Sequence, residues 1–218
     1  NNEILSSLTL EDFAPQMYED VESGVFVYPA SSQDCSEYSA SEYSAGRGFT
    51  TIMTLDLFGD DLEMEVDHIT SSWAHVYSSQ DMLILAEPAN DWWWFWRNSD
   101  WDDATNIHSF DISEPGYTQY IGSGRVDGTV QDQFSISEFE GSVRIASTSD
   151  AWARWWLMDE VDESGEPIWN GPTNQVSILQ PNEEGELEQI GFIGSIAEGE
   201  TIWSARFVAD RGYLVTFE

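Results

Sequence analysis

A β-hairpin pattern that occurs three times constrains the fold of this chain more than any other feature. The clearest copy is residues 133–148, where two alternating stretches flank a tight turn at Glu140-Gly141. Related patterns occupy residues 75–87 and 206–218. Repeats of this length that are built from strands indicate propeller blades or another stacked array.

The three hairpins align on their turns when Asp81, Gly141 and Gly212 are placed together. The two intervals between successive turns are then of similar length. The alignment also brings together the positions that follow each turn: Leu83, Val143 and Leu214, and then Ala86, Ala146 and Phe217.

Two further strands are predicted before each hairpin from alternation of apolar and polar residues. The opening strands are residues 51–57, 106–112 and 175–179, and the second strands are 62–69, 117–122 and 187–193. Each repeat then holds four antiparallel strands, which is the content of one blade. We therefore predict an all-β fold with about three four-stranded antiparallel, propeller-like blades.

The repeats divide the chain into two parts. Residues 1–48 match the repeat poorly and form an irregular N-terminal arm or an incomplete blade. The propeller-type repeats cover 49–218 and are separated by two Trp-rich loops; the repeats are at about 49–90, 104–150 and 173–218, and the loops at 91–103 and 151–172.

Three blades leave exposed edges, because closed propellers have about 4 to 8 blades. The last predicted strand, residues 212–217, is apolar and carries no charge or Pro, so its edge invites pairing. We expect this array to belong to a larger propeller, or to be completed by partner chains or copies of itself. Residues 1–48 are the candidate donor of a covering strand.

Three segments carry a resemblance to a known family: IHSFDI, YIGSGRVDGTVQDQFSISEFEGSVRIAST and GSIAEGETIWSARFVADRGYLVTFE. They resemble secreted proteins with a C-terminal β-propeller domain distantly related to WD40 repeats, over about residues 49–218. The resemblance implies a propeller fold and a secreted, extracellular or cell-surface location. It implies no catalytic residues. The start at Asn1 without Met is what we expect of a mature or excised product.

The charge of the chain is strongly one-sided. The 41 acidic residues face 7 basic ones, all Arg, which gives a net charge of −34. Such a surface repels nucleic acid and anionic lipid, so neither is expected as a partner. It suits a halophilic setting, where salt screens like charges; an ordinary acidic secreted protein is the alternative.

Cysteine content and hydropathy exclude two further features. Cys35 is the only cysteine, so no disulfide forms within the chain. No apolar run approaches the roughly 20 residues of a membrane span.

Most of the 11 Trp residues fall into two clusters. Each cluster begins at the same offset from an equivalent alanine, Ala86 or Ala146, which predicts that both lie on the same side of the array. Large aromatic rings anchor glycans, peptides or other subunits; the alternative is a lid packed on the blades. The candidate residues are Trp92, Trp93, Trp94, Trp96 and Trp101, with Trp152, Trp155 and Trp156.

An acidic segment follows the first Trp cluster. Asn98, Asp100, Asp102 and Asp103 have a spacing that can turn several oxygens toward a hard cation such as Ca²⁺. The segment lacks the Gly and the distal Glu of a complete EF-hand loop. A solvated acidic turn is the alternative interpretation.

No catalytic spacing is evident in the sequence. The three histidines, His68, His75 and His108, are not spaced as a metal pair, and the latter two fall in predicted strands. The sequence therefore favours a non-enzymatic extracellular binding or assembly module with an aromatic-rich, acidic loop face. The alternative is a carbohydrate-active hydrolase that uses loop carboxylates beside the Trp platforms.

The excess of acids predicts that salt stabilises the fold. Screening shortens the reach of like-charge repulsion to about 3 Å at 1 M salt. We expect the midpoint of thermal unfolding to rise between low salt and molar NaCl, measured by circular dichroism. A flat or falling midpoint would contradict this expectation.

Overall fold

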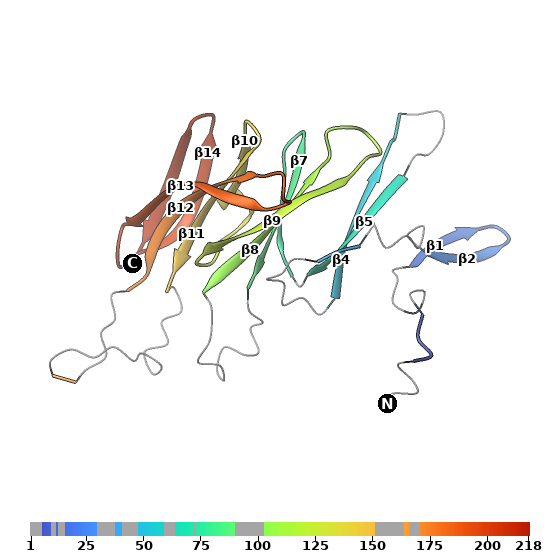
Figure 1. The fold of residues 1–218 in the computed structure, drawn as a ribbon, viewed down its shortest axis with the longest axis horizontal. Coiled ribbons are helices and arrows are strands. Elements are labelled where there is room, and N and C mark those ends of the chain that lie inside the picture. The colour runs from blue at the N-terminus through green and yellow to red at the C-terminus, as the bar shows by residue number, and fades with distance from the viewer. Residues whose placement is uncertain are drawn as a thin grey trace.

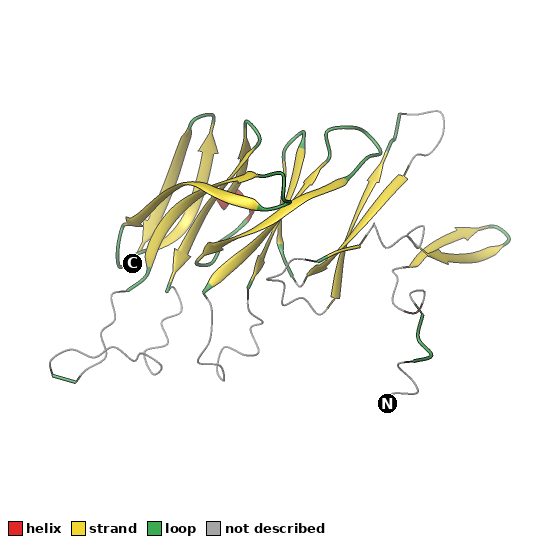
Figure 2. Cartoon of the chain, viewed as in Figure 1, coloured by secondary structure: helices red, strands yellow, loops and turns green. Residues whose placement is uncertain are grey.

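The computed structural model describes residues 6–9, 12, 16–29, 38–40, 48–58, 64–71, 73–89, 103–150, 164–165 and 171–218. The elements in these residues are β-strands and the 3-10 helix η4 (Gln133–Ser135). The predicted all-β fold is confirmed, as Figure 2 shows. No helix in the described part of the chain is long and apolar enough to cross a membrane.

Two four-stranded antiparallel sheets lie in the middle of the array (Figure 1). The first central sheet has the order β6-β7-β8-β9, with bounds His75–Ser78, Met82–Pro88, Ala104–Asp111 and Gln119–Asp127. The second central sheet has the order β10-β11-β12-β13, with bounds Ile136–Phe139, Ser142–Ser149, Thr173–Pro181 and Leu187–Ile196.

Smaller sheets flank the central ones at opposite ends of the stack (Figure 1). On one side is the leading pair, β4 (Gly48–Leu55) and β5 (Met64–Ser71), with β3 (Tyr38–Ser39) parallel to β5. On the other is the trailing hairpin, β14 (Thr201–Val208) and β15 (Arg211–Phe217). A separate hairpin, β1 (Gln16–Val21) and β2 (Gly24–Pro29), belongs to the predicted arm.

The membership of the four-stranded sheets differs from the prediction. Each central sheet joins the hairpin that ends one repeat to the two strands that open the next, for example β6–β7 to β8–β9. The sheets are therefore displaced by half a repeat along the chain. Alternation specifies the two faces of a strand but not its neighbour, so the sequence pattern fits both groupings.

The alignment of the third hairpin was wrong by two positions. Its turn is Ala209-Asp210, because Val208 pairs with Arg211 just as Phe139 pairs with Ser142. Gly141 thus corresponds to Asp210 and not to Gly212. A slip of two positions keeps every side chain on the same face, so the hydrophobic pattern alone does not reveal it.

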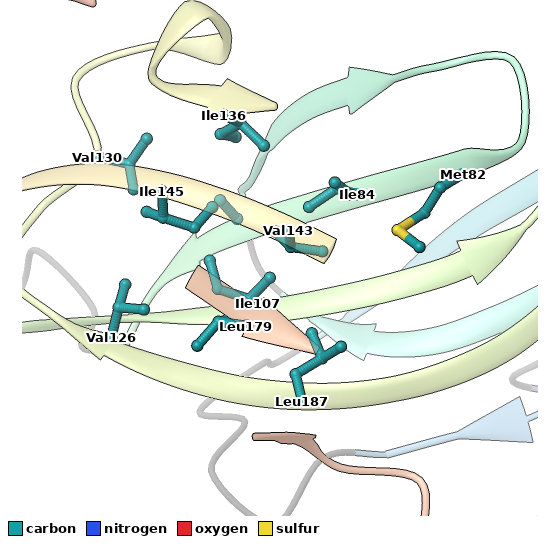
Figure 3. Packing of buried hydrophobic residues seen from close by; sticks show 11 residues of the cluster. Met82, Ile84, Ile107, Val126, Val130, Ile136, Val143, Ile145, Leu179 and Leu187 are labelled. Carbon is teal, nitrogen blue, oxygen red and sulfur yellow. The ribbon is translucent and has the colours of Figure 1, made fainter. Parts of the chain in front are cut away.

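Apolar layers fill the spaces between successive sheets. Met82, Ile84 and Ala86 of β7 pack with Val143 and Ile145 of the second central sheet, in the largest cluster (Figure 3). The intervening Leu85 points the other way and packs with residues of the leading pair and β8: Ile52, Ile69 and Phe110. A third layer, under the trailing hairpin, holds Ala146, Ile202 and Ala205.

Two glycines let the central sheets approach closely along β9. Ser123 N donates to Gly185 O at 3.2 Å, and Ser123 forms a parallel bridge with Glu186. A Cβ on Gly122 would collide with the Gly185 carbonyl, and one on Gly124 would lie 2.6 Å from Leu187 O. β9 therefore requires glycine at positions 122 and 124, because the backbone of the neighbouring sheet leaves no space for a Cβ there.

We predict that Gly124→Ala destabilises the protein, because the new methyl group meets a carbonyl that cannot rotate away. Overpacking of this kind costs about 1–3 kcal/mol of unfolding free energy, measurable by denaturant titration. Gly48→Ala is the matched control, since a Cβ there meets nothing nearer than 3.9 Å. Equal stability of the two variants would refute the close approach.

Candidate binding surface

The residues that flank the two Trp-rich segments lie at one end of the central sheets. Ala89 and Asp103 flank the first segment, and Asp150 and Gly171 flank the second. Ala89 N donates to Ala104 O at 2.9 Å, and Asp150 N donates to the Asp103 carboxylate at 2.6 Å. We call this end of the stack, where both segments are rooted, the root end.

Asp103 connects the two roots. Its Oδ1 accepts from Thr129 Oγ1 at 3.1 Å, its Oδ2 accepts from Asp150 N, and its backbone oxygen accepts from Gly128 N at 2.6 Å. Gly128 and Thr129 lie on the connection that follows β9, and Asp150 lies on the connection that follows β11. The carboxylate therefore fixes the start of β8 against the ends of β9 and β11.

The chain beside Asp103 is held by a second set of contacts. Thr129 and Thr148 exchange backbone hydrogen bonds of 2.8 and 3.0 Å, which join the two central sheets. Gly128 has φ +82, and a Cβ there would lie 2.7 Å from Thr148 O. Thr105 Oγ1 donates to Gly128 O at 2.7 Å. Only glycine satisfies both the positive φ and the close approach.

Two buried amides at the start of β12 complete the network. Asn174 Nδ2 donates to Ile196 O and Glu200 O, both at 2.9 Å, and so orders the turn before β14. Gln175 Nε2 donates to Asp127 O at 2.5 Å and to Ser149 Oγ at 3.1 Å. These donors satisfy buried carbonyls that would otherwise be costly.

Of the binding residues predicted from the sequence, only Asp103 lies in the described part of the chain. Of the four predicted Ca²⁺ ligands, only Asp103 is described, and both of its carboxylate oxygens accept hydrogen bonds from the protein. Among the described residues no group of three or more His, Cys, Asp or Glu side chains is placed to hold a metal. The remaining ligands and the eight candidate Trp residues lie outside the described residues: Asn98, Asp100 and Asp102, with Trp92, Trp93, Trp94, Trp96, Trp101, Trp152, Trp155 and Trp156.

Two exposed Trp residues that sequence reasoning did not single out do lie at the root end. Trp73 is in the β5–β6 connection and is 68% exposed; Trp203 is near the start of β14 and is 69% exposed. Antiparallel order brings these positions to the same end as the β7–β8 and β11–β12 connections. Their signal in the sequence was a lone Trp directly before or within the first strand of a hairpin.

The histidines are packed strand residues, as expected for His75 and His108. His108 Nε2 lies 3.2 Å from Glu87 Oε1, with both side chains buried. Burial lowers the pKa of His75, against the opposing attraction of Asp132 and the backbone of Val130, so its ring is mainly neutral at pH 7. His68 is also buried, and its Nδ1 lies 3.0 Å from Thr51 Oγ1.

Comparison with known proteins identifies a family over the whole sequence. A family model described as "Beta propeller domain" matches residues 1–218. An uncharacterized protein of Methanocaldococcus jannaschii is 26% identical over 113 residues, which are 52% of this chain and 14% of that protein. An uncharacterized protein of Archaeoglobus fulgidus is 27% identical over 123 residues, which are 54% of this chain and 16% of that protein. The chain thus corresponds to a small part of these relatives.

The hydrogen bonds that the Asp103 carboxylate accepts predict that its replacement destabilises the protein. Asp103→Ala abolishes two hydrogen bonds to a charged acceptor, and we expect a loss of about 2–4 kcal/mol of unfolding free energy, measured by denaturant titration. Glu188→Ala, at an exposed position of β13, is the control. A loss no larger than that of the control would show that Asp103 does not hold the roots together.

Proposed function

This chain belongs to the beta propeller domain family, and we propose that it is a non-enzymatic, extracellular binding or assembly module. A propeller domain fits a binding or assembly role. The proposal adds that the ligand surface is the root end and that its contacts are aromatic. A carbohydrate hydrolase remains a prediction from the sequence alone, because no described observation favours it.

The observation that carries the proposal is the common rooting of the two Trp-rich segments. Hydrogen bonds from Thr129 and Asp150 to the Asp103 carboxylate hold together the last flanking residue of the first segment and the first flanking residue of the second. Trp73 and Trp203 add exposed indoles at the same end. Rigid aromatic side chains lose little conformational entropy on binding, which favours them as anchors.

The chemistry of the root end indicates the class of ligand. Indole faces stack on sugar rings and on apolar or cationic peptide side chains. A net charge of −34 disfavours anionic ligands such as nucleic acids. We therefore propose a neutral glycan or a neutral to basic peptide as the ligand, and an extracellular or cell-surface location for the encounter.

Replacement of the clustered Trp residues tests the proposal. We expect a variant with Ser at Trp92, Trp93, Trp94 and Trp96 to lose at least about tenfold in affinity on polysaccharide and peptide arrays, equivalent to about 1.4 kcal/mol. Phe58→Ser is the matched control, because Phe58 is 97% exposed in the β4–β5 turn at the opposite end of the sheets. Unchanged binding by the Trp variant would remove the aromatic surface from the proposal.

A further inference from the structure

The β1–β2 hairpin repeats the form of the hairpins that begin the central sheets. Its strands are joined by a two-residue turn, because Val21 pairs with Gly24 just as Phe139 pairs with Ser142. The second strands of these hairpins, β2, β7 and β11, begin at similar intervals along the chain, at Gly24, Met82 and Ser142. The match to the beta propeller domain family includes these residues. The β1–β2 hairpin is therefore a further copy of the repeated unit.

Each central sheet joins such a hairpin to the two strands that follow it in the chain. β6–β7 is followed by and paired with β8–β9, and β10–β11 is followed by and paired with β12–β13. The antiparallel pair that follows β1–β2 is β4–β5. The connection between β2 and β4, residues 30–47, is longer than 89–103 between β7 and β8, and shorter than 150–172 between β11 and β12. The chain is thus long enough for the same junction.

β4 has the features of β8, the strand that receives the hairpin in the first central sheet. Asp56 and Asp111 stand at the ends of β4 and β8, and each accepts a 2.8 Å hydrogen bond from the backbone two residues later. With these aspartates aligned, Ile52 corresponds to Ile107, and both are buried against the sheet that follows. β8 pairs with β9 on one side and with β7 on the other. The strand of this chain that corresponds to β7 as a neighbour of β4 is β2.

The composition of the two strands favours contact between them. β2 reads GVFVYP and β4 reads GFTTIMTL, so neither adds a charge to a shared ladder, although the chain has a net charge of −34. The successive residues Val25, Phe26 and Val27 lie on both faces of β2 and are 60%, 53% and 52% exposed. A two-stranded hairpin that is apolar on both faces is marginally stable in water by itself. Packing on further strands is therefore favourable for it.

The surface that would receive Phe26 is also exposed. Phe26 corresponds to Ile84 of β7, which belongs to the largest core cluster together with Ile136 of the next hairpin (Figure 3). The residue of β6 that corresponds to Ile136 is Val76, because these two residues pair with equivalent positions of β11 and β7. Ile136 is 2% exposed, whereas Val76 is 52% exposed. Phe26 and Val76 are thus the two apolar groups that this seam of the stack leaves uncovered.

We infer that β2 pairs antiparallel with β4 of the same chain, which gives a sheet of order β1-β2-β4-β5. In the structure the hairpin is a sheet of its own, so this pairing describes a docked state of the hairpin. The first central sheet sets the register, since Ile84 there pairs with Ser109. By equivalence Phe26 faces Thr54, and Val27 points to the opposite face of the sheet.

Docking gives the root end a third pair of strand ends. β7 ends at Pro88 and β8 begins at Ala104 on that end, and β11 and β12 are placed likewise. In the docked sheet Pro29 and Gly48 take the equivalent places. The ligand surface proposed for the root end is then bordered by three sheets. This consequence rests on the proposed function, whereas the pairing of β2 with β4 does not.

Cysteine cross-linking within the chain tests the register. In a Cys35→Ser background, Phe26→Cys combined with Thr54→Cys should form an intramolecular disulfide under mild oxidation, because facing residues of antiparallel strands have Cα atoms about 4.5–5.5 Å apart. Val27→Cys combined with Thr54→Cys is the matched control, because Val27 is as exposed as Phe26 but points to the other face. Equal cross-linking of both pairs, or of neither, would overturn the register. A disulfide that joins two chains would overturn the assignment to one chain.

Hydrogen exchange tests the docked state without cross-linking. Phe26→Asp places a charge against Val76, and we expect the amides of β4 to exchange at least about tenfold faster than in Val25→Asp. Val25→Asp is the matched control, because it adds the same charge to the same strand on the opposite face. Equal exchange in the two variants would show that the hairpin does not dock on β4. Both experiments are read without ligand, so their outcome is independent of the glycan and peptide binding that tests the proposed function.

Discussion

Burial of both faces of each central sheet is the constraint on which the rest of the structure depends. Adjacent residues of β7 show it: Ile84 packs toward the second central sheet, whereas Leu85 packs toward the leading pair. A strand that is apolar on both faces is stable only between two neighbours. The fold is therefore a serial stack, in which each sheet is stabilised by the sheets before and after it, as in repeat proteins.

The sequence predicted the strands and their faces, because alternation and turn residues are local signals. The sheet neighbours are not local. The hairpin at residues 75–88 pairs with β8 across a Trp-rich segment, and alternation is the same whether it pairs forward or stays with β4–β5. The misalignment that assigned Gly212 to the turn in place of Asp210 has the same origin, because a shift of two residues leaves the alternation of apolar and polar side chains unchanged.

The root end shows a different limit of prediction. Asp103 was predicted as a cation ligand because it lies among other acids, and that prediction is untested. The sequence did not predict the hydrogen bonds that its carboxylate accepts from a hydroxyl and a backbone amide of later connections. The sequence did not single out Asn174 and Gln175 as structural residues, because tertiary structure determines their hydrogen-bond acceptors. Gln175, for example, donates to the backbone oxygen of Asp127, which lies 48 residues earlier. Local sequence signals do not predict polar contacts between connections, because these contacts form only when the sheets pack together.

The placement of charge follows the division between strands and turns. An acidic surface keeps copies apart through repulsion that extends about 10 Å at 0.1 M salt. The described acids concentrate in turns, such as Glu140, Asp210 and the 182–186 connection, whereas β4 and the apolar part of β15 carry none. Repulsion between acidic turns therefore acts against random edge-to-edge contact between chains, whereas β4 and the apolar part of β15 add no acidic side chain to it.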